Sequence, residues 1–211
     1  APDPQAVYNM PGYAKVVVAV AEKLDATDAV FVGWSLGGHI LLEAVPSLPD
    51  AAGFVIFGTP PVGFPLAENA FFPTDKVAIG FTPELTLEQM QGYVGSFFSP
   101  GYVDSVDDLP ASFMEDIAAT DGMARASLGM SISPDGFADE VAIVAGMKQP
   151  LAILHGAQEQ LVNAEYISGL NMPTLWKGAV QFVDGAGHAP HYETPDKFNA
   201  LLTAFAKDAA K

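Results

Sequence analysis

The segment AVFVGWSLGGHILLEA, residues 29–44, constrains the fold of this chain more than any other stretch. Residues 29–33 are a short apolar run that predicts a strand buried on both faces. Residues 36–45 have the spacing of a helix. Between them, GWSLG fits the pattern Gly-x-Ser-x-Gly, which is weak evidence alone but is here placed between a strand and a helix. The sequence therefore predicts a sharp strand-to-helix turn that exposes Ser35.

Further apolar runs predict strands at residues 52–61, 151–156 and 179–187. A helix that begins after Asn9 and a C-terminal helix that begins after Thr194 each start with a capping residue followed by a proline in the first turn. Strands that alternate with helices indicate an α/β fold with a mostly parallel sheet flanked by helices.

The middle of the chain follows a different pattern. Residues 62–146 contain no strong strand signal and several segments with helical spacing. We therefore predict a core formed by residues 1–61 and 147–211, with a helical cap inserted between its two parts. The cap is rich in Phe, Met and Leu, so part of it is expected to line an apolar channel suited to an acyl chain.

Composition excludes several classes of function. The chain has 211 residues, a formal net charge of −16 and no cysteine. A strongly acidic surface repels nucleic acids and anionic lipids, so neither is an expected partner. The lack of cysteine rules out a disulfide framework, a thiolate nucleophile and a zinc–thiolate site. No apolar run is long enough to span a membrane, and the expected location is the cytoplasm.

The predicted turn gives Ser35 the surroundings of a nucleophile. The N-terminus of the following helix points at the serine, and its free N–H groups and dipole stabilise negative charge there. The Leu36 N–H is the expected first donor of an oxyanion hole. Trp34, directly beside the serine, is a candidate for contact with the substrate.

A serine nucleophile needs a base, and His188 is the best placed of the four histidines. It follows the last predicted strand in a glycine-flanked loop, where catalytic groups collect at the carboxyl edge of a parallel sheet. His191 is the alternative base. His39, on the helix after the serine, is expected to pack or cap, and His155 is expected to have a structural role.

The base in turn needs a carboxylate to hold its tautomer. Glu159 lies in the loop after the strand at residues 151–156 and is our candidate. Asp184 and Glu193 are competitors, but Asp184 lies on the strand that leads to the histidine and Glu193 lies beyond it. The chain order Ser35, Glu159, His188 is the order of one known triad class.

Several segments of the chain resemble those of a known superfamily. The segments DAVFVGWSLGGH, GTPPV, HGAQEQLV and VDGAGHAPHYETPDKFNALLTAF are similar to those of the α/β-hydrolase superfamily. Within it, GWSLGGHI, FGTPPV and DIAATDGMAR are similar to the α/β-hydrolase-fold N-acyl-homoserine lactonases, as is a glutamate in the acid position. In that group a cap tyrosine helps hold the substrate, and the resemblance implies this role for Tyr93.

The resemblance also implies segments that are not in this sequence. In the superfamily, several strands precede the first helix found here and carry a second oxyanion donor. We therefore expect the chain to be the C-terminal portion of a longer polypeptide whose upstream fragment stays bound. Without that fragment, the strand at residues 29–33 is expected to become an exposed apolar edge.

The function expected from these observations is that of a serine hydrolase that cleaves a carboxylic ester or lactone through an acyl-enzyme. The resemblance implies an N-acyl-homoserine lactone as the substrate. A general carboxylesterase acting on small or aryl esters is the alternative, and a non-catalytic ligand-binding protein is a third. No metal and no organic cofactor is expected, because the mechanism needs neither.

Overall fold

The computed structural model describes residues 3–210. Its centre is a sheet of parallel strands in the order β1 (Val30–Trp34), β2 (Gly53–Phe57), β3 (Leu151–Gly156) and β4 (Gln181–Val183). This confirms the predicted α/β class with a mostly parallel sheet. β2 and β4 are shorter than predicted because Gly58 and Gly185, with φ of 61° and 79°, turn the chain away from the sheet soon after each strand.

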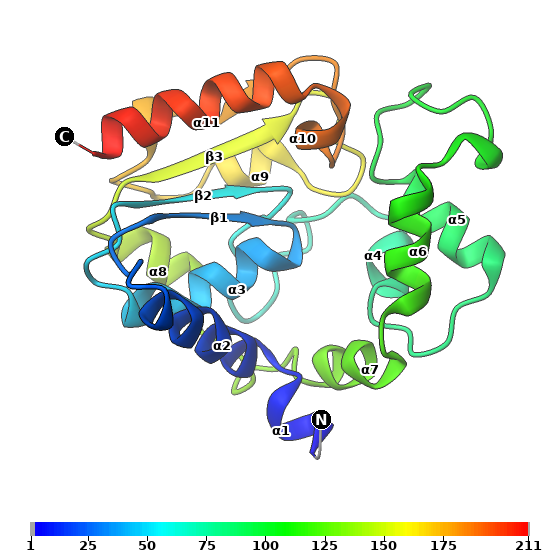
Figure 1. Ribbon diagram of the computed structural model, residues 1–211, viewed down its shortest axis with the longest axis horizontal. Helices are drawn as coiled ribbons and strands as arrows, with labels where there is room; N and C mark the ends of the chain where they lie inside the picture. Colours follow the sequence, from blue (N-terminus) through cyan, green and yellow to red (C-terminus); the bar gives the residue numbers. More distant parts are fainter. Residues whose placement is uncertain (1–2, 211) are drawn as a thin grey trace.

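Helices cover both faces of the sheet (Figure 1). On one face, α3 (Leu36–Ala44) packs on β1 and β2, with α2 (Met10–Lys23) and α8 (Glu140–Gly146) beside it. On the other face, α11 (Pro195–Ala209) packs on β2 and β3. The strands point their carboxyl ends toward a separate group of helices that follows β2 in the chain.

The hydrophobic core follows the alternation of side chains along β2. Phe54 and Ile56 belong to a cluster with residues of α3, whereas Val55 and Phe57 belong to a cluster with Phe198 and Phe205 of α11. Successive side chains of a strand point to opposite faces. A strand buried on both faces is therefore apolar along its length, as β2 is, and as β3 is apart from His155.

The prediction of burial on both faces is wrong for β1. The side chain of Val32 is 44% exposed, because β1 is an edge strand that pairs only with β2 in the described part of the chain. An apolar edge of this kind leaves backbone donors and acceptors without partners. That further strands and an upstream fragment cover this edge stays a prediction.

The helices between β2 and β3 are α4 (Lys76–Ile79), α5 (Leu87–Gly95), α6 (Ala111–Ala119), α7 (Gly122–Met130) and α8, with the 3₁₀ turn η2 (Val106–Asp108) before α6. In Figure 1, α4–α7 stand beyond the carboxyl ends of the strands. By contrast, α8 packs against α3.

The remaining elements are short helices and 3₁₀ turns. They are α1 (Pro4–Val7), η1 (Val45–Ser47), α9 (Ala164–Ser168), η3 (Trp176–Gly178) and α10 (Pro190–Glu193). The predicted cap of α2 is confirmed, because Asn9 Oδ1 accepts a hydrogen bond from the Gly12 N–H at 2.8 Å. Thr194 occupies the position before α11 but does not cap it, since its hydroxyl donates to the Pro190 carbonyl at 3.4 Å instead.

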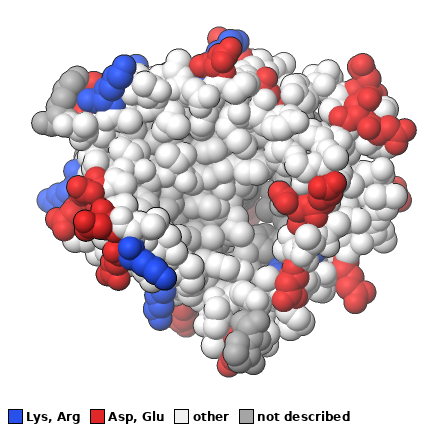
Figure 2. Space-filling model, in the orientation of Figure 1, with Lys and Arg blue, Asp and Glu red and all other residues white. Residues whose placement is uncertain are grey.

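Charged side chains stand apart on the face shown in Figure 2. Its acidic side chains form separate groups, most of them near the outline and one right of centre, and a wide uncharged area lies between them. On this face the negative charge is therefore spread over several groups. Within residues 3–210, no helix combines the length and apolar character needed to cross a membrane.

Candidate active site

Ser35 lies at a strained turn between the end of β1 and the start of α3. Its backbone has φ 52° and ψ −121°, a conformation that residues other than glycine rarely adopt. Two hydrogen bonds hold it: the Ser35 N–H donates to the Phe57 carbonyl at 2.8 Å, and the Thr59 hydroxyl donates to the Ser35 carbonyl at 2.7 Å. No sequence pattern indicated a role for Thr59, because its contact with Ser35 depends on how the loop after β2 folds.

The glycines around Ser35 allow β1 and α3 to approach closely. A Cβ atom added at Gly33 would lie 2.6 Å from the Gly37 carbonyl oxygen and 2.8 Å from Gly38 Cα. At Gly38 it would lie 2.1 Å from the Thr59 hydroxyl oxygen, whereas at Gly37 it would meet nothing within 4 Å. The turn therefore leaves no room for a side chain at Gly33 or Gly38. Gly37 has room for one, and its own backbone is what lies close to Gly33.

The substitution Gly33→Ala is expected to destabilise the protein by about 1–3 kcal/mol, the usual cost of forcing atoms into a close-packed region. Its contacts are with backbone, so the helix must shift away from the strand. The free energy of unfolding measured in urea checks this. The matched control is Gly37→Ala, which should leave stability unchanged or slightly raised because alanine favours helix. Equal losses in both variants would contradict the close-approach account.

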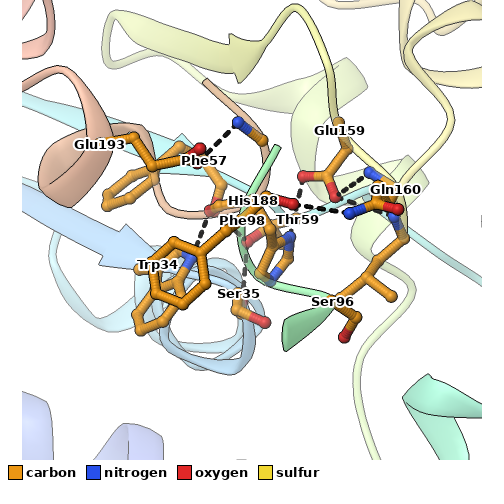
Figure 3. Close-up of polar contacts among 12 residues, drawn as sticks. Trp34, Ser35, Phe57, Thr59, Ser96, Phe98, Glu159, Gln160, His188 and Glu193 are labelled. Atoms are coloured by element: carbon orange, nitrogen blue, oxygen red, sulfur yellow. Dashed lines mark hydrogen bonds and ion pairs between the residues drawn. The ribbon is translucent and has the colours of Figure 1, made fainter. Parts of the chain in front are cut away.

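His188 and Glu159, predicted as base and acid, are in contact in the structure (Figure 3). His188 Nδ1 lies 2.8 Å from Glu159 Oε2, and both side chains are 2% exposed. Glu159 Oε1 accepts hydrogen bonds from the N–H groups of Gln160 at 2.9 Å and Leu161 at 2.8 Å. An ionised carboxylate in this position keeps the hydrogen of the imidazole on Nδ1 and leaves a lone pair on Nε2.

The ionised form of Glu159 is favoured by its neighbours. Burial alone raises the pKa of this carboxyl, but the charge of His188 and the hydrogen bonds from His188 and Leu161 outweigh burial and lower the pKa. A carboxyl whose pKa is lower in the folded state stabilises the fold above its ordinary pKa. This contribution is lost as the pH falls through the pKa of the folded state.

Ser35 lies on the other side of the His188 ring from Glu159, as Figure 3 shows. The His188 Nε2 atom is buried and has no hydrogen-bond partner among residues 3–210. No Ser35–His188 hydrogen bond is formed in this part of the chain, although both residues line one cavity. Catalytic hydrogen bonds are often longer without substrate and shorten when it binds, so this geometry suits a serine–histidine pair.

The loop that carries His188 is fixed on both sides. The Trp34 indole N–H donates to the His188 carbonyl at 2.7 Å. The carboxylate of Glu193 accepts from the Gly187 N–H and from the Ser99 N–H, each at 2.7 Å. Glu193, considered above as a competing acid, therefore ties the histidine loop to the segment after α5. No sequence signal indicated this role, since it joins residues far apart in the chain.

The cavity beside Ser35 and His188 has a volume of about 290 Å³. Its lining is mostly apolar and comes from both the sheet region and the helices that follow β2. Polar side chains line it only at five positions of the described chain: Ser35, His39, Tyr93, Glu140 and His188. Burial raises the pKa of Tyr93, with the charge of Arg125 opposing this, so its hydroxyl is protonated at neutral pH.

A second cavity of about 390 Å³ shares Ser35, Leu36 and Tyr93 with the first. Trp34 lines this second cavity and not the first. His191, the alternative base, also lines it, with its ring 4.8 Å from that of Trp34 between ring centroids. Its Nδ1 atom is buried and has no hydrogen-bond partner among the described residues, so nothing there orients it as Glu159 orients His188.

The two other histidines, His39 and His155, do not replace His188 as the base candidate. His155 is buried in β3, and burial lowers its pKa, an effect that the charge of Glu159 opposes. His39 lines the first cavity and contacts Glu140, a carboxylate that the sequence did not associate with it. Among residues 3–210, no group of three or more metal-binding side chains lies close enough to hold an ion.

A parallel sheet with a serine at a strained turn after a strand is the arrangement of one large class of hydrolases. Residues 2–201 match the model of the alpha/beta hydrolase family. The chain therefore belongs to this family and is a hydrolase of the α/β type. Comparison with curated proteins gives no match.

Solved structures refine this assignment. The chain is similar to a variant of the N-acyl homoserine lactonase AidH complexed with N-hexanoyl homoserine lactone, with a TM-score of 0.91 and 32% identity over 99% of this chain and 74% of that one. It shares its fold with an esterase from Exiguobacterium antarcticum, at a TM-score of 0.75 and 17% identity over 95% of this chain and 75% of the other. A bromoperoxidase from Bacillus anthracis shares the fold at a TM-score of 0.74 and 19% identity, over 95% of this chain and 75% of that one.

Proposed function

We propose that this protein hydrolyses N-acyl-homoserine lactones through an acyl-enzyme formed on Ser35. The observation that carries the proposal is the environment of His188, which contacts buried Glu159 through Nδ1. Its Nε2 atom has no hydrogen-bond partner in the described part of the chain and lies beside a serine at a strained turn. The similarity to a lactonase over nearly the whole chain supports the choice of substrate class.

In the first half of the reaction, the Ser35 oxygen attacks the lactone carbonyl carbon while His188 Nε2 takes the serine proton. Glu159 holds the ring and stabilises the imidazolium. The negative charge on the carbonyl oxygen is bound by the Leu36 N–H, one of the first-turn donors that α3 leaves without an intrahelical partner. Cleavage of the ring C–O bond then takes the proton from His188 and gives a hydroxyl on the bound acyl group.

In the second half, water attacks the ester carbon of the acyl-enzyme and gives its proton to His188. The serine oxygen leaves, recovers that proton, and the product is the open-chain N-acyl homoserine. The apolar lining of the 290 Å³ cavity suits the acyl chain of such a substrate. Trp34 lines the neighbouring cavity, and we propose that it contacts the substrate from there.

The substrate class is tested by comparing kcat/KM for N-hexanoyl homoserine lactone with kcat/KM for an aryl hexanoate ester. The account predicts a higher value for the lactone. A value higher for the ester by an order of magnitude or more would assign the protein as a general carboxylesterase. Binding without turnover of either compound would favour the non-catalytic alternative.

We propose that Tyr93 donates a hydrogen bond to the bound substrate, since it lines both cavities beside Ser35. Tyr93→Phe is expected to raise KM for the lactone by about 2- to 12-fold, the range for one neutral hydrogen bond, with little change in kcat. Steady-state kinetics measures both constants. Tyr102→Phe, at an exposed tyrosine, is the matched control. An unchanged KM in Tyr93→Phe would remove Tyr93 from the substrate site.

Three further proposals concern the cap, the location of the protein and its upstream fragment. We propose that residues 62–146 act as a cap over the site, with α8 packed on the core at their end. A cytoplasmic location remains a prediction. So does the association with an upstream fragment, which mass spectrometry of the intact protein under native and then denaturing conditions can test.

A further inference from the structure

A second histidine–carboxylate pair lines the cavity that contains Ser35 and His188. His39 Nδ1 lies 2.9 Å from both carboxylate oxygens of Glu140, and Glu140 is only 1% exposed. Both residues line the cavity. Neither has a part in the proposed mechanism, although a buried carboxylate is costly unless its partners compensate.

The structure fixes Glu140 firmly. It is the first residue of α8, and its Oε2 atom accepts a hydrogen bond from the Val62 N–H at 2.8 Å. In return, the Glu140 N–H donates to the Val62 carbonyl at 2.9 Å. These bonds hold the carboxylate in one position, and its contact with Nδ1 sets the orientation of the His39 ring.

With Nδ1 directed to Glu140, the opposite edge of the imidazole is the part of His39 that can contact a ligand. Nε2 of His39 makes no hydrogen bond to residues 3–210, and the side chain is 13% exposed. A buried carboxylate keeps the hydrogen on Nδ1, so Nε2 carries a lone pair and accepts hydrogen bonds. In a mostly apolar cavity, such an acceptor selects a ligand with a hydroxyl or N–H group.

The position of His39 sets where that group must lie. Ser35 directly precedes α3 and His39 is the fourth residue of the helix, so His39 lies roughly one turn, about 6 Å, further along the axis, and both side chains line the same cavity. In an N-acyl-homoserine lactone, carbon 3 of the acyl chain is five bonds from the lactone carbonyl carbon. Three bonds of extended chain span 3.8 Å, so five span roughly 6 Å.

We propose that His39, oriented by Glu140, is a specificity residue whose Nε2 accepts a hydrogen bond from a hydroxyl group on carbon 3 of the acyl chain. This inference rests on the proposed lactonase function, because it takes the attacked carbonyl to be that of a lactone. It adds a preference for 3-hydroxyacyl substrates over unsubstituted ones.

Two variants separate recognition from a structural role. In His39→Asn, the amide nitrogen lies where Nδ1 lies, so the contact with Glu140 is kept and the group at Nε2 is lost. In His39→Gln, the amide lies near the position of Nε2, so an acceptor for the ligand is kept and the contact with Glu140 is lost. Stability should therefore fall more in His39→Gln than in His39→Asn. The preference for the 3-hydroxyacyl lactone over the unsubstituted one should fall more in His39→Asn.

The first measurement is kcat/KM for N-(3-hydroxyhexanoyl) and N-hexanoyl homoserine lactone. His39→Asn is expected to lower the ratio of the two values by about 2- to 12-fold, the range for one neutral hydrogen bond. It should leave the value for the unsubstituted lactone and the melting temperature nearly unchanged. An unchanged ratio, or an equal loss for both lactones, would overturn the proposal.

The second measurement is calorimetric binding of the same two lactones to Ser35→Ala protein with and without His39→Asn. A hydroxyl preference that depends on His39 supports the inference even if the wild-type protein hydrolyses neither lactone, in which case the proposed function alone fails. Hydrolysis by the wild type with equal affinity for both lactones overturns the inference and leaves the function standing.

Discussion

The substitution Ser35→Ala is expected to reduce kcat/KM for N-hexanoyl homoserine lactone by a factor of about 10⁴ or more, because it removes the atom that forms the acyl-enzyme. Only stabilisation by the oxyanion donors and substrate binding would remain. Binding of the lactone should persist, since its acyl chain contacts the apolar lining of the cavity and not the serine oxygen. Hydrolysis measured by release of acid, together with calorimetric binding, checks both parts.

A serine elsewhere provides the control. Ser131 donates a hydrogen bond to the Leu128 carbonyl at the end of α7, at 2.7 Å, and Ser131→Ala should retain full activity. The melting temperatures of both variants should stay close to that of the wild-type protein, because neither hydroxyl supports the core. Activity within tenfold of wild type in Ser35→Ala would refute the assignment of the nucleophile.

The substitution Glu159→Gln is expected to lower kcat/KM by about 10³–10⁴-fold, through the tautomer of His188. The N–H groups of Gln160 and Leu161 require an acceptor, so the carbonyl oxygen of the new amide faces them. Its NH₂ group then faces His188 Nδ1. This places the imidazole hydrogen on Nε2, the nitrogen that must take the serine proton.

Two controls belong to this prediction. Glu43→Gln changes a carboxylate that accepts a hydrogen bond from the Ala138 N–H. Glu43 has no part in the proposed mechanism, so this variant should leave kcat/KM unchanged. Because the pKa of Glu159 is lowered by folding, the difference in free energy of unfolding between wild type and Glu159→Gln should shrink as the pH falls below the ordinary carboxyl range. A difference that grows at acid pH would contradict the ionised carboxylate.

Much of the fold and part of the site follow from local patterns. The turn at Ser35 combines a strand, close-packed glycines and a helix within one short segment, so its conformation is encoded where it occurs. The contact between His188 and Glu159 was predictable because both follow strands of one parallel sheet, and the carboxyl ends of such strands meet.

Contacts that depend on the packing of distant segments were not predictable. Glu140 lies near His39 because α8 returns to the core beside α3, and nothing in its own sequence marks this. Glu193 was weighed as a catalytic acid, whereas in the structure it joins the histidine loop to the distant Ser99 by accepting a hydrogen bond from the Ser99 N–H. The exposed edge at β1 was expected for the chain without an upstream fragment, whereas the apolar run alone predicted burial, because such a run does not reveal how many neighbours its strand has.

The central claim is that His188 and Glu159 make Ser35 a nucleophile. The most direct test is to treat the folded protein with a fluorophosphonate and to map the modified peptide by mass spectrometry. We expect a stoichiometric adduct on Ser35 that forms much more slowly in Glu159→Gln and does not form when the protein is denatured before the reagent is added. An adduct on another serine, or an unmodified Ser35 in folded protein, would contradict it.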